Sequence, residues 1–299
     1  MFKGKTIEVG IAPIGWTNDD MPDLGGDISF KQCISEMEIA GYTGTEIGNK
    51  YPQDPQVLKG ILASHGLRVA NRWFSMFLLT KSYQENEDAF VKQCEFLKET
   101  GSRIIGVSEQ SYSIQGQMDT PVFEKKYVMN DIEWARFNEG LNKLGKVALD
   151  RFGIHMSFHH HMGTVVQTAE EIDKMMDGTD SRYVNLLFDS GHLAYCGEDY
   201  IAVLKKYVQR VRHVHLKDIR PEVVLKVKEK HMSFLQGVRK GTFTVPGDGV
   251  VDFKQIFEIL DNAGYEGWLL VEAEQDPEKA LPLRYAKKAR AYIKETAGI

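Results

Sequence analysis

Short runs of apolar and β-branched residues alternate with longer amphipathic segments from one end of the chain to the other. Short apolar runs bounded by turn residues indicate buried strands, whereas apolar residues spaced three and four apart indicate helices. The expected strands are residues 7–12, 44–47, 67–73, 103–108, 154–159, 184–189, 212–216 and 268–272. The expected helices are residues 30–40, 55–65, 86–100, 131–151, 168–177, 200–207, 252–263 and 277–296.

Several expected helices stop at a glycine that leads into the next strand; the clearest are Gly41, Gly66, Gly101 and Gly264. The residue after a helix often adopts a left-handed conformation, which favours glycine. The unit of strand, helix and stop recurs eight times, which favours a parallel sheet closed into a barrel over an open doubly wound sheet. We therefore expect an α/β protein with a single (β/α)8 TIM barrel domain over residues 1–299.

Two expected connections, residues 16–27 and 220–249, are longer than a barrel requires. They follow the carboxyl ends of the first and the seventh expected strands. Long loops at that end of a barrel usually shape or cover the active site, although a surface excursion without such a role would show the same pattern.

The composition is that of an ordinary globular enzyme, with 42% hydrophobic residues, 26% charged residues and a net charge of −5. This balance argues against sequence-independent binding of nucleic acid, which depends on clustered Lys and Arg. The chain shows neither an apolar signal region nor an apolar stretch of membrane length, so we expect a cytoplasmic protein that does not bind a membrane. Cys33, Cys94 and Cys196 lack a CxxC spacing, which indicates reduced thiols rather than a disulfide framework or a structural zinc site.

Four strand-like runs in the second half of the chain end in residues that bind divalent metals. They are Ser157-Phe158-His159-His160-His161, Leu187-Phe188-Asp189-Ser190-Gly191-His192, His213-Val214-His215-Leu216-Lys217-Asp218 and Leu270-Val271-Glu272-Ala273-Glu274. A single strand-end His or Asp is more often a structural residue than a metal ligand. The carboxyl ends of all barrel strands lie at one end of the barrel, so agreement across four strands favours convergence on one ion.

Alternation along a strand adds detail to this interpretation. His159 and His161 point to one side of their strand, as do Glu272 and Glu274 on theirs, so each pair reaches the barrel mouth together. A mixed set of imidazoles and carboxylates suits Mn²⁺, Co²⁺, Fe²⁺ or Zn²⁺, and we favour Mn²⁺ or Co²⁺.

Two residues beside these motifs are candidates for proton transfer. His192 lies three residues after Asp189, so one of them could bind the ion while the other faces the substrate; alternatively, His192 only caps the next helix. Lys217 lies close to His215, where it could stabilise a developing oxyanion or transfer a proton, or form a salt bridge with a neighbouring carboxylate.

Four further residues are candidates for substrate binding because they lie near strand ends. Glu46 and Glu109 end the second and fourth expected strands and could bind substrate hydroxyls or pair with a basic residue. Trp16 and Trp73 could line a sugar pocket, although a Trp in a protein of this size more often belongs to the core.

The motifs as a set resemble the xylose isomerase-like TIM barrel superfamily, which includes sugar isomerases, sugar epimerases and endonuclease IV. Within it, they are most similar to the dehydratases of myo-inositol catabolism, and the resemblance covers essentially the whole chain. The motifs are Gly10-Ile11-Ala12-Pro13-Ile14-Gly15-Trp16 with Asn18-Asp19-Asp20, Gly44-Thr45-Glu46, His159-His160-His161-Met162-Gly163-Thr164, Asp189-Ser190-Gly191-His192, His213-Val214-His215-Leu216-Lys217-Asp218 and Glu272-Ala273-Glu274-Gln275-Asp276.

The resemblance implies a ligand set. Superfamily members commonly bind their ion through Glu, Asp, His and Glu from the fifth to eighth strands, which implies Asp189, His215 and Glu272 in this chain. The fifth strand departs from the pattern, because His159, or His161 two residues later, stands where many relatives have a carboxylate. The resemblance also implies dependence on Mn²⁺ or Co²⁺ and a contribution from glutathione.

The implied reaction is dehydration of a small molecule, 2-keto-myo-inositol, to a trihydroxycyclohexanedione. An ion would acidify the C–H beside the ketone. Glu272 or His161 would then act as the base, and His192 or Lys217 would assist the departing hydroxyl. The chain could also form a homo-oligomer.

Two other functions are compatible with the same residues. A ketose isomerase or epimerase would use the same enediolate chemistry, and a sugar-binding scaffold would keep the barrel without catalysis. A nuclease like endonuclease IV needs more zinc ligands and a basic surface, which the net charge of −5 does not support.

Overall fold

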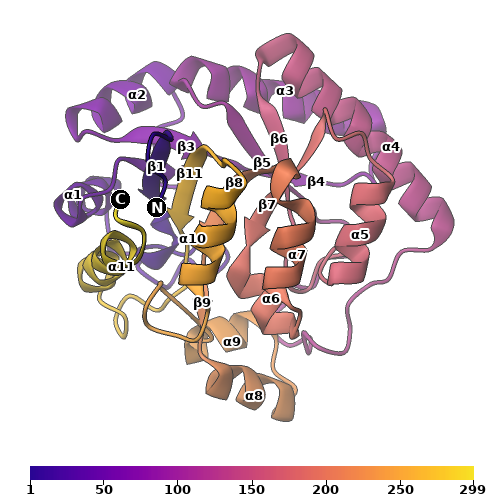
Figure 1. The fold of residues 1–299 in the computed structure, drawn as a ribbon. Coiled ribbons are helices and arrows are strands. Elements are labelled where there is room, and N and C mark those ends of the chain that lie inside the picture. Colours follow the sequence, from indigo (N-terminus) through magenta and orange to yellow (C-terminus); the bar gives the residue numbers. More distant parts are fainter.

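The computed structural model describes residues 1–299. Nine parallel strands form one sheet around a central axis, and helices surround it (Figure 1). The strands are β1 (Ile7–Ile11), β2 (Gly44–Glu46), β3 (Arg68–Asn71), β4 (Trp73–Met76), β5 (Ile104–Glu109), β6 (His155–His159), β7 (Val184–Asp189), β8 (Val211–Leu216) and β11 (Gly267–Val271). The expected TIM barrel is confirmed.

The helices follow the strands in the order expected for βα units. They are α1 (Phe30–Ala40), α2 (Pro55–Ser64), α3 (Tyr83–Thr100), α4 (Asp131–Val147), α5 (Ala169–Asp177), α6 (Ser190–Cys196), α7 (Tyr200–Tyr207), α8 (Pro221–Glu229), α9 (Phe234–Lys240), α10 (Phe253–Asn262) and α11 (Pro282–Ala297). The predicted glycine stops Gly41, Gly66, Gly101 and Gly264 all have positive φ, between 66° and 90°. This is the left-handed conformation that glycine adopts without strain.

The third expected strand differs from the prediction, because it is broken at Arg72 into β3 and β4. The sheet order is β3-β2-β1-β11-β8-β7-β6-β5-β4, so the two pieces of this strand form its two edges. The side chain of Asn71 crosses the gap. Its Oδ1 atom accepts hydrogen bonds from the backbone N–H groups of Gly106 at 2.6 Å and Arg72 at 2.7 Å. A side chain thus replaces part of the missing backbone ladder between β3 and β5.

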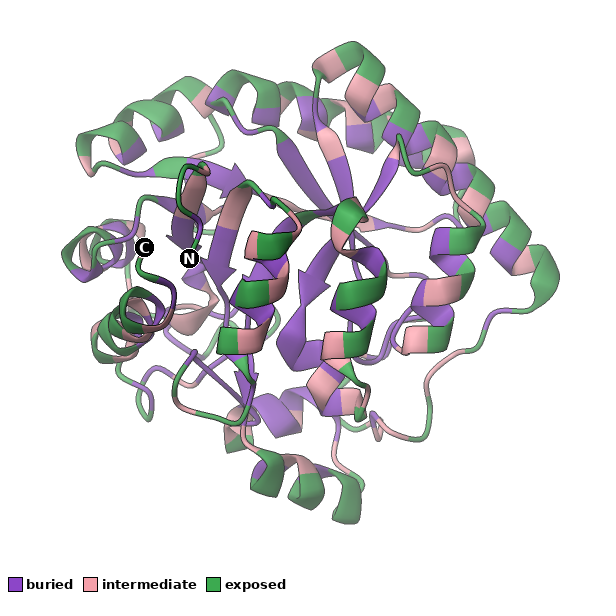
Figure 2. Cartoon of the chain, viewed as in Figure 1, coloured by how far each residue is buried: buried purple, intermediate pink, exposed green.

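The core lies between the sheet and the helices. Figure 2 shows that the strands are largely buried and that the helices expose their outer faces. The largest group of contacting buried apolar residues contains 61 members and a second group of 12 lies apart from it, so the barrel and the long loops have separate cores. No helix is both long and apolar enough to cross a membrane.

The long connection after β8 is more ordered than expected for a loop. It contains α8, α9 and a small antiparallel pair, β9 (Asp218–Ile219) with β10 (Phe243–Thr244). Apolar residues of this segment, among them Phe234 and Phe243, form the second core together with Met21 and Leu24 of the long loop after β1. The two long loops therefore pack together at the carboxyl end of the barrel.

Candidate metal centre and active site

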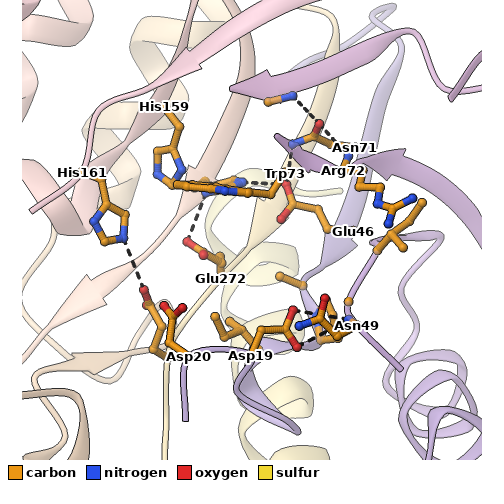
Figure 3. A pocket seen from close by; sticks show the side chains of 18 of the residues that line it. Asp19, Asp20, Glu46, Asn49, Asn71, Arg72, Trp73, His159, His161 and Glu272 are labelled. Carbon is orange, nitrogen blue, oxygen red and sulfur yellow. Dashed lines mark hydrogen bonds and ion pairs between the residues drawn. The ribbon is translucent and has the colours of Figure 1, made fainter. Parts of the chain in front are cut away.

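A polar cavity of about 240 Å³ lies at the carboxyl ends of the strands. Figure 3 shows His159 and His161 on one side of it and Glu46, Asn71 and Arg72 on the other. The lining residues are Ala12, Pro13, Ile14, Thr17, Asp19, Asp20, Glu46, Ile47, Gly48, Asn49, Asn71, Arg72, Trp73, Gly106, Gln115, His159, His161, Leu187, His215, Glu272 and Glu274. Since five of these 21 residues are hydrophobic, the cavity suits a ligand rich in hydroxyl groups.

The four predicted metal ligands lie side by side; His159, His215 and Glu272 line this cavity, and Asp189 contacts them without lining it. The Oδ2 atom of Asp189 lies 3.3 Å from Nε2 of His159 and 3.4 Å from Nδ1 of His215. Nδ1 of His215 lies 3.1 Å from Oε2 of Glu272. All four side chains are buried, and together they come from β6, β7, β8 and the end of β11. The topology therefore brings them together as the strand-end pattern predicts.

The donor atoms fit a divalent cation. Nδ1 of His215 has no hydrogen-bond partner and lies 3.1 Å from Oε2 of Glu272, an oxygen that also pairs with Lys217. Donor atoms of His159, Asp189, His192 and Glu272 also lie within 4.8 Å of one another. Imidazole nitrogens and carboxylate oxygens are ligands for Mn²⁺, Co²⁺ and Zn²⁺.

His215 is a better candidate ligand than His192. The Nε2 atom of His192 is 2.9 Å from Nζ of Lys217, and its Nδ1 atom faces the N–H of Met162 at 3.4 Å. Both nitrogens of His192 therefore have partners. On His215, Nε2 faces Oε1 of Glu46 at 2.8 Å, which leaves Nδ1 to face the carboxylates.

Glu46 connects the centre to the broken third strand. Its Oε1 atom also accepts a hydrogen bond from Asn71 at 2.8 Å and lies 3.3 Å from Nε2 of His213. Burial favours the neutral form of Glu46, but the imidazole of His215 and the hydrogen bonds from both histidines hold its pKa well below the usual value. Burial opposes protonation of His215, but Glu46 and Glu272 hold its pKa well above the usual value, so an ion at Nδ1 would displace the proton there while Nε2 stays hydrogen-bonded to Glu46.

Lys217 lies behind the cavity wall and not in it. Its side chain is fully buried, and its ammonium group lies 2.7 Å from Glu272, 2.9 Å from Glu274 and 3.5 Å from Asp189. Burial favours the neutral amine, but these carboxylates raise the pKa of Lys217 above its ordinary value. Lys217 is therefore a buried cation that pairs with two of the residues lining the cavity.

Two residues that were predicted to act in catalysis lie outside the cavity lining. His192 and Lys217 were expected to assist the leaving group, but neither lines the cavity. The His192 ring is tilted by 43° against the His161 ring, with centroids 3.7 Å apart, and Lys217 pairs with Glu272 and Glu274. Both therefore lie behind the residues that line the cavity.

His161 and Glu274 are the titratable groups that face the cavity next to the predicted ligands. Nδ1 of His161 lies 2.8 Å from the carbonyl oxygen of Met162, so Nδ1 carries the proton and Nε2 is free to accept one. Burial, His159 and Lys217 hold the pKa of His161 well below its usual value. Burial raises the pKa of Glu274 to about 7, although Lys217 opposes this shift. A neutral imidazole and a protonatable carboxyl thus lie with Nε2 and Oε1 4.0 Å apart.

The four predicted substrate contacts divide into two pairs. Glu46 and Trp73 line the cavity, where the Trp73 ring meets the His159 ring edge-on at 5.3 Å. Trp16 does not, since its indole is buried in the core and donates to Glu36 at 2.7 Å. Glu109 is fully buried and accepts backbone hydrogen bonds from Leu78 and Ser111. The expectation that Trp16 and Glu109 contact a substrate therefore conflicts with their burial.

Sequence reasoning missed a second set of lining residues. They are Asp19, Asp20, Asn49, Arg72 and Gln115. Asp19 accepts from the N–H of Asn49 at 3.3 Å, and the guanidinium group of Arg72 lies over the ring of Phe96. The available signal was the polar loop after the first strand, in which Asn18-Asp19-Asp20 was noted as a motif but was not assigned a role in the site.

Comparison with known proteins agrees with the fold and identifies the family. The family model described as xylose isomerase-like TIM barrel matches residues 30–296. A Clostridium perfringens protein named inosose dehydratase is 61% identical over 293 residues, and the matched region spans 98% of each of the two chains. A Geobacillus thermodenitrificans protein of the same name is 57% identical over 299 residues, with complete coverage of both chains.

Solved structures at lower identity share the fold. The IOLI protein with a binding zinc atom has a TM-score of 0.70 and 14% identity, over 97% of this chain and 98% of its own. The probable 3-DHS dehydratase AsbF from Bacillus anthracis has a TM-score of 0.72 and 12% identity, over 96% of this chain and 98% of its own. From its full-length similarity to the curated relatives, the chain belongs to the inosose dehydratase family of xylose isomerase-like TIM barrels.

Proposed function

We propose that this protein is a metal-dependent hydro-lyase that converts 2-keto-myo-inositol (scyllo-inosose) to a trihydroxycyclohexane-1,2-dione. The observation that carries the proposal is the convergence of His159, Asp189, His215 and Glu272 on one another beside a polar cavity, in a chain of the inosose dehydratase family. This set would hold Mn²⁺ or Co²⁺. When bound, such an ion supplies a Lewis acid that makes the C–H beside a ketone more acidic.

His161 is the best candidate for the base. Its free Nε2 atom belongs to a lining residue, and its depressed pKa keeps the imidazole neutral and able to accept a proton near pH 7. We therefore assign removal of the proton beside the ketone to Nε2 of His161. Glu272, the other predicted base, has its carboxylate engaged by His215 and Lys217.

Glu274 is the best candidate for the acid that protonates the departing hydroxyl. It lines the cavity next to His161, and its carboxyl pKa of about 7 allows it to carry a proton at neutral pH. Lys217 and His192 act behind it as positioning residues, at 2.9 Å and 3.9 Å from its carboxylate oxygens. Removal of the C–H proton by His161 and transfer of a second proton from Glu274 to the departing hydroxyl would complete a β-elimination of water, and the enol so formed would tautomerise to the dione.

The remaining lining residues suit a cyclic polyol. Asp19, Asp20, Asn49 and Gln115 supply hydrogen-bond acceptors and donors around the cavity, and Trp73 supplies one flat apolar face. Substrate hydroxyl groups both donate and accept hydrogen bonds, so they match such a lining. We infer that this set selects a small polyhydroxylated ring.

The test is an assay of purified protein with scyllo-inosose in the presence of Mn²⁺ or Co²⁺. We expect absorbance of a conjugated dione to develop, to disappear with EDTA and to return with added metal. His161→Gln and Glu274→Gln should each lower kcat by about 100-fold, as loss of acid or base catalysis does. A parallel reaction with added glutathione tests whether this thiol contributes.

Conversion of ketoses to their epimers or aldose isomers, without formation of the dione, would contradict the proposal and favour an isomerase. Glu109→Gln is a matched control, because it removes the charge of a buried strand-end carboxylate that does not line the cavity. Unchanged kcat in this control would show that the losses at positions 161 and 274 are local to the site.

A further inference from the structure

The ammonium group of Lys217 lies inside the cluster of candidate metal donors. It is 2.7 Å from Oε2 of Glu272 and 3.5 Å from Oδ2 of Asp189. These are the same two oxygen atoms that face His215 and, for Asp189, also His159. The lysine and a divalent ion would therefore share carboxylate oxygens.

The residues around Lys217 hold its backbone and its side chain in position beside the candidate metal ligands. Ser190 donates its hydroxyl to the carbonyl oxygen of Lys217 at 2.8 Å and accepts from its N–H at 3.3 Å. Gly191 leaves room for the aliphatic stem, because a Cβ atom there would lie 2.3 Å from Cγ and 2.6 Å from Cδ of the lysine. The ring of Phe243 lies 4.6 Å from Nζ.

These contacts give the Asp189-Ser190-Gly191-His192 motif a second purpose. Asp189 and His192 contact the ammonium group, Ser190 holds the backbone and Gly191 accommodates the stem. Each of the four consecutive residues thus contacts or makes room for Lys217. A lysine that only balanced surface charge would not need such a cradle.

The charges explain why the cation is needed. Asp189, Glu272 and Glu274 bring three buried carboxyl groups within 3.5 Å of one nitrogen atom. Buried carboxylates without a counter-charge strongly destabilise a fold, and removing one partner of a buried ion pair has a large effect. A divalent ion would neutralise the same groups, so the lysine and the ion both compensate the same negative charge.

We propose that Lys217 is a built-in cation of the metal centre, which keeps the metal-free site folded and lowers its affinity for divalent ions by electrostatic competition. The inference rests on the metal centre of the proposed function but not on the reaction. If so, the metal-free protein stays folded. Metal also exchanges at this site more readily than it would at a site with the same carboxylates and no lysine.

The test uses Lys217→Met, which keeps the length of the side chain and removes its charge. Calorimetric titration of the metal-free protein with Mn²⁺ should give a Kd at least about tenfold lower than that of the wild type, since a unit charge a few ångströms from the ion is removed. The melting temperature of the metal-free variant should fall by roughly 5–10 °C, and saturating Mn²⁺ should restore most of it.

Two further variants keep the test decisive. Gly191→Ala retains every charge but displaces the lysine stem, so it should also tighten Mn²⁺ binding and lower the metal-free melting temperature. Lys126→Met removes a lysine that pairs with Glu171 outside the site, and it should leave the Kd for Mn²⁺ unchanged. If Lys217→Met cannot be obtained free of metal, the Gly191→Ala result decides.

Equal or weaker Mn²⁺ binding in Lys217→Met or, where that variant cannot be prepared, in Gly191→Ala would overturn the proposal. Loss of dehydration activity with tighter Mn²⁺ binding would leave it standing, because binding and melting are measured without substrate. Tighter binding in a protein that never dehydrates keto-inositols would support Lys217 as a built-in cation and contradict only the proposed reaction.

Discussion

Glu46 shows how one residue outside the expected ligand set can control a ligand. It was expected to bind substrate hydroxyls, and it does line the cavity, but its Oε1 atom lies 2.8 Å from His215 and accepts from Asn71. A carboxylate that accepts the Nε2 proton of a histidine fixes the tautomer in which Nδ1 can bind an ion. Glu46 therefore acts on the metal centre through His215.

Replacement of Glu46 by Gln should weaken metal binding without removing a ligand. The amide accepts the His215 proton less strongly, so Nδ1 is a poorer donor, and we expect the Kd for Mn²⁺ to rise by about 10- to 100-fold. Calorimetric titration checks this value. Glu109→Gln should leave the Kd for Mn²⁺ as in the wild type. An equal rise of the Kd in both variants would show that loss of any buried carboxylate charge weakens metal binding, and that Glu46 has no specific effect through His215.

His155, at the opposite end of β6, predicts a pH dependence of stability away from the metal centre. Burial, followed by the nearby Arg212 and Arg103, lowers its pKa in the folded protein. At pH above about 6.5 the imidazole of His155 is neutral in both the folded and the unfolded protein. On acidification the unfolded chain binds a proton at His155 before the folded protein does, so the folded protein loses stability. His155→Gln should therefore reduce the fall in melting temperature between pH 7 and pH 5. An unchanged pH profile would show that His155 does not contribute to it.

At the scale of elements, the broken third strand has a structural cause that sequence alone did not reveal. The run 67–73 is apolar enough for one strand, but the chain must pass from pairing with β2 to pairing with β5 while it closes the barrel. Asn71 satisfies backbone groups at this transition, and Gly106 leaves room for it, because a Cβ at position 106 would lie 2.5 Å from Nδ2 of Asn71. The break also places Arg72 at the cavity.

Asn71→Ala should therefore destabilise the barrel by about 2–3 kcal/mol, because buried backbone N–H groups lose their acceptor. Urea unfolding measures this free energy. Asn185→Ala is the matched control, since this buried strand asparagine donates one hydrogen bond to Met156 and bridges no gap. A similar loss in both variants would show that Asn71 has no special part in closing the sheet.

The helices that were missed have a common explanation. The segments α6, α8 and α9 are seven to nine residues long and lie between a barrel strand and its outer helix, where the repeating strand-helix pattern predicts no additional helix. They fold because their apolar sides meet residues that are distant in sequence: Phe234 of α9 contacts Tyr195 of α6, with ring centroids 6.3 Å apart. Longer outer helices such as α1 and α10 were predicted almost to the residue, because each carries a continuous apolar face towards the sheet.

On the scale of the whole molecule, the sequence predicts that the strand ends converge. It does not predict which of the strand-end side chains face the cavity and which are buried behind its lining. Parallel strands of a barrel must end at one mouth, which is why His159, Asp189, His215 and Glu272 come together. Whether a residue faces the cavity or lies one layer deeper depends on what covers it. Phe234 and Phe243, from the segment after β8, pack on His192 and leave it no path to the cavity.

The second core thus links the long loops to the chemistry. Phe234 lies with its ring 5.0 Å from that of His161 and is itself buried, so it excludes water from the proposed base. Burial is the largest contribution that lowers the pKa of His161. If His161 is the base, the segment after β8 would serve the reaction as well as the packing, which is the role expected for a long loop at this end of the barrel.

Phe234→Ala separates these two roles. Loss of a fully buried Phe should cost about 3–5 kcal/mol in free energy of unfolding, and water that enters beside His161 should raise its pKa and lower kcat for keto-inositol dehydration at pH 6–7. Phe253→Ala, in the core under α10, should give a comparable loss of stability with kcat unchanged. Urea unfolding and the pH profile of kcat are the measurements. If both variants keep the wild-type pH profile, the segment after β8 only stabilises the barrel mouth.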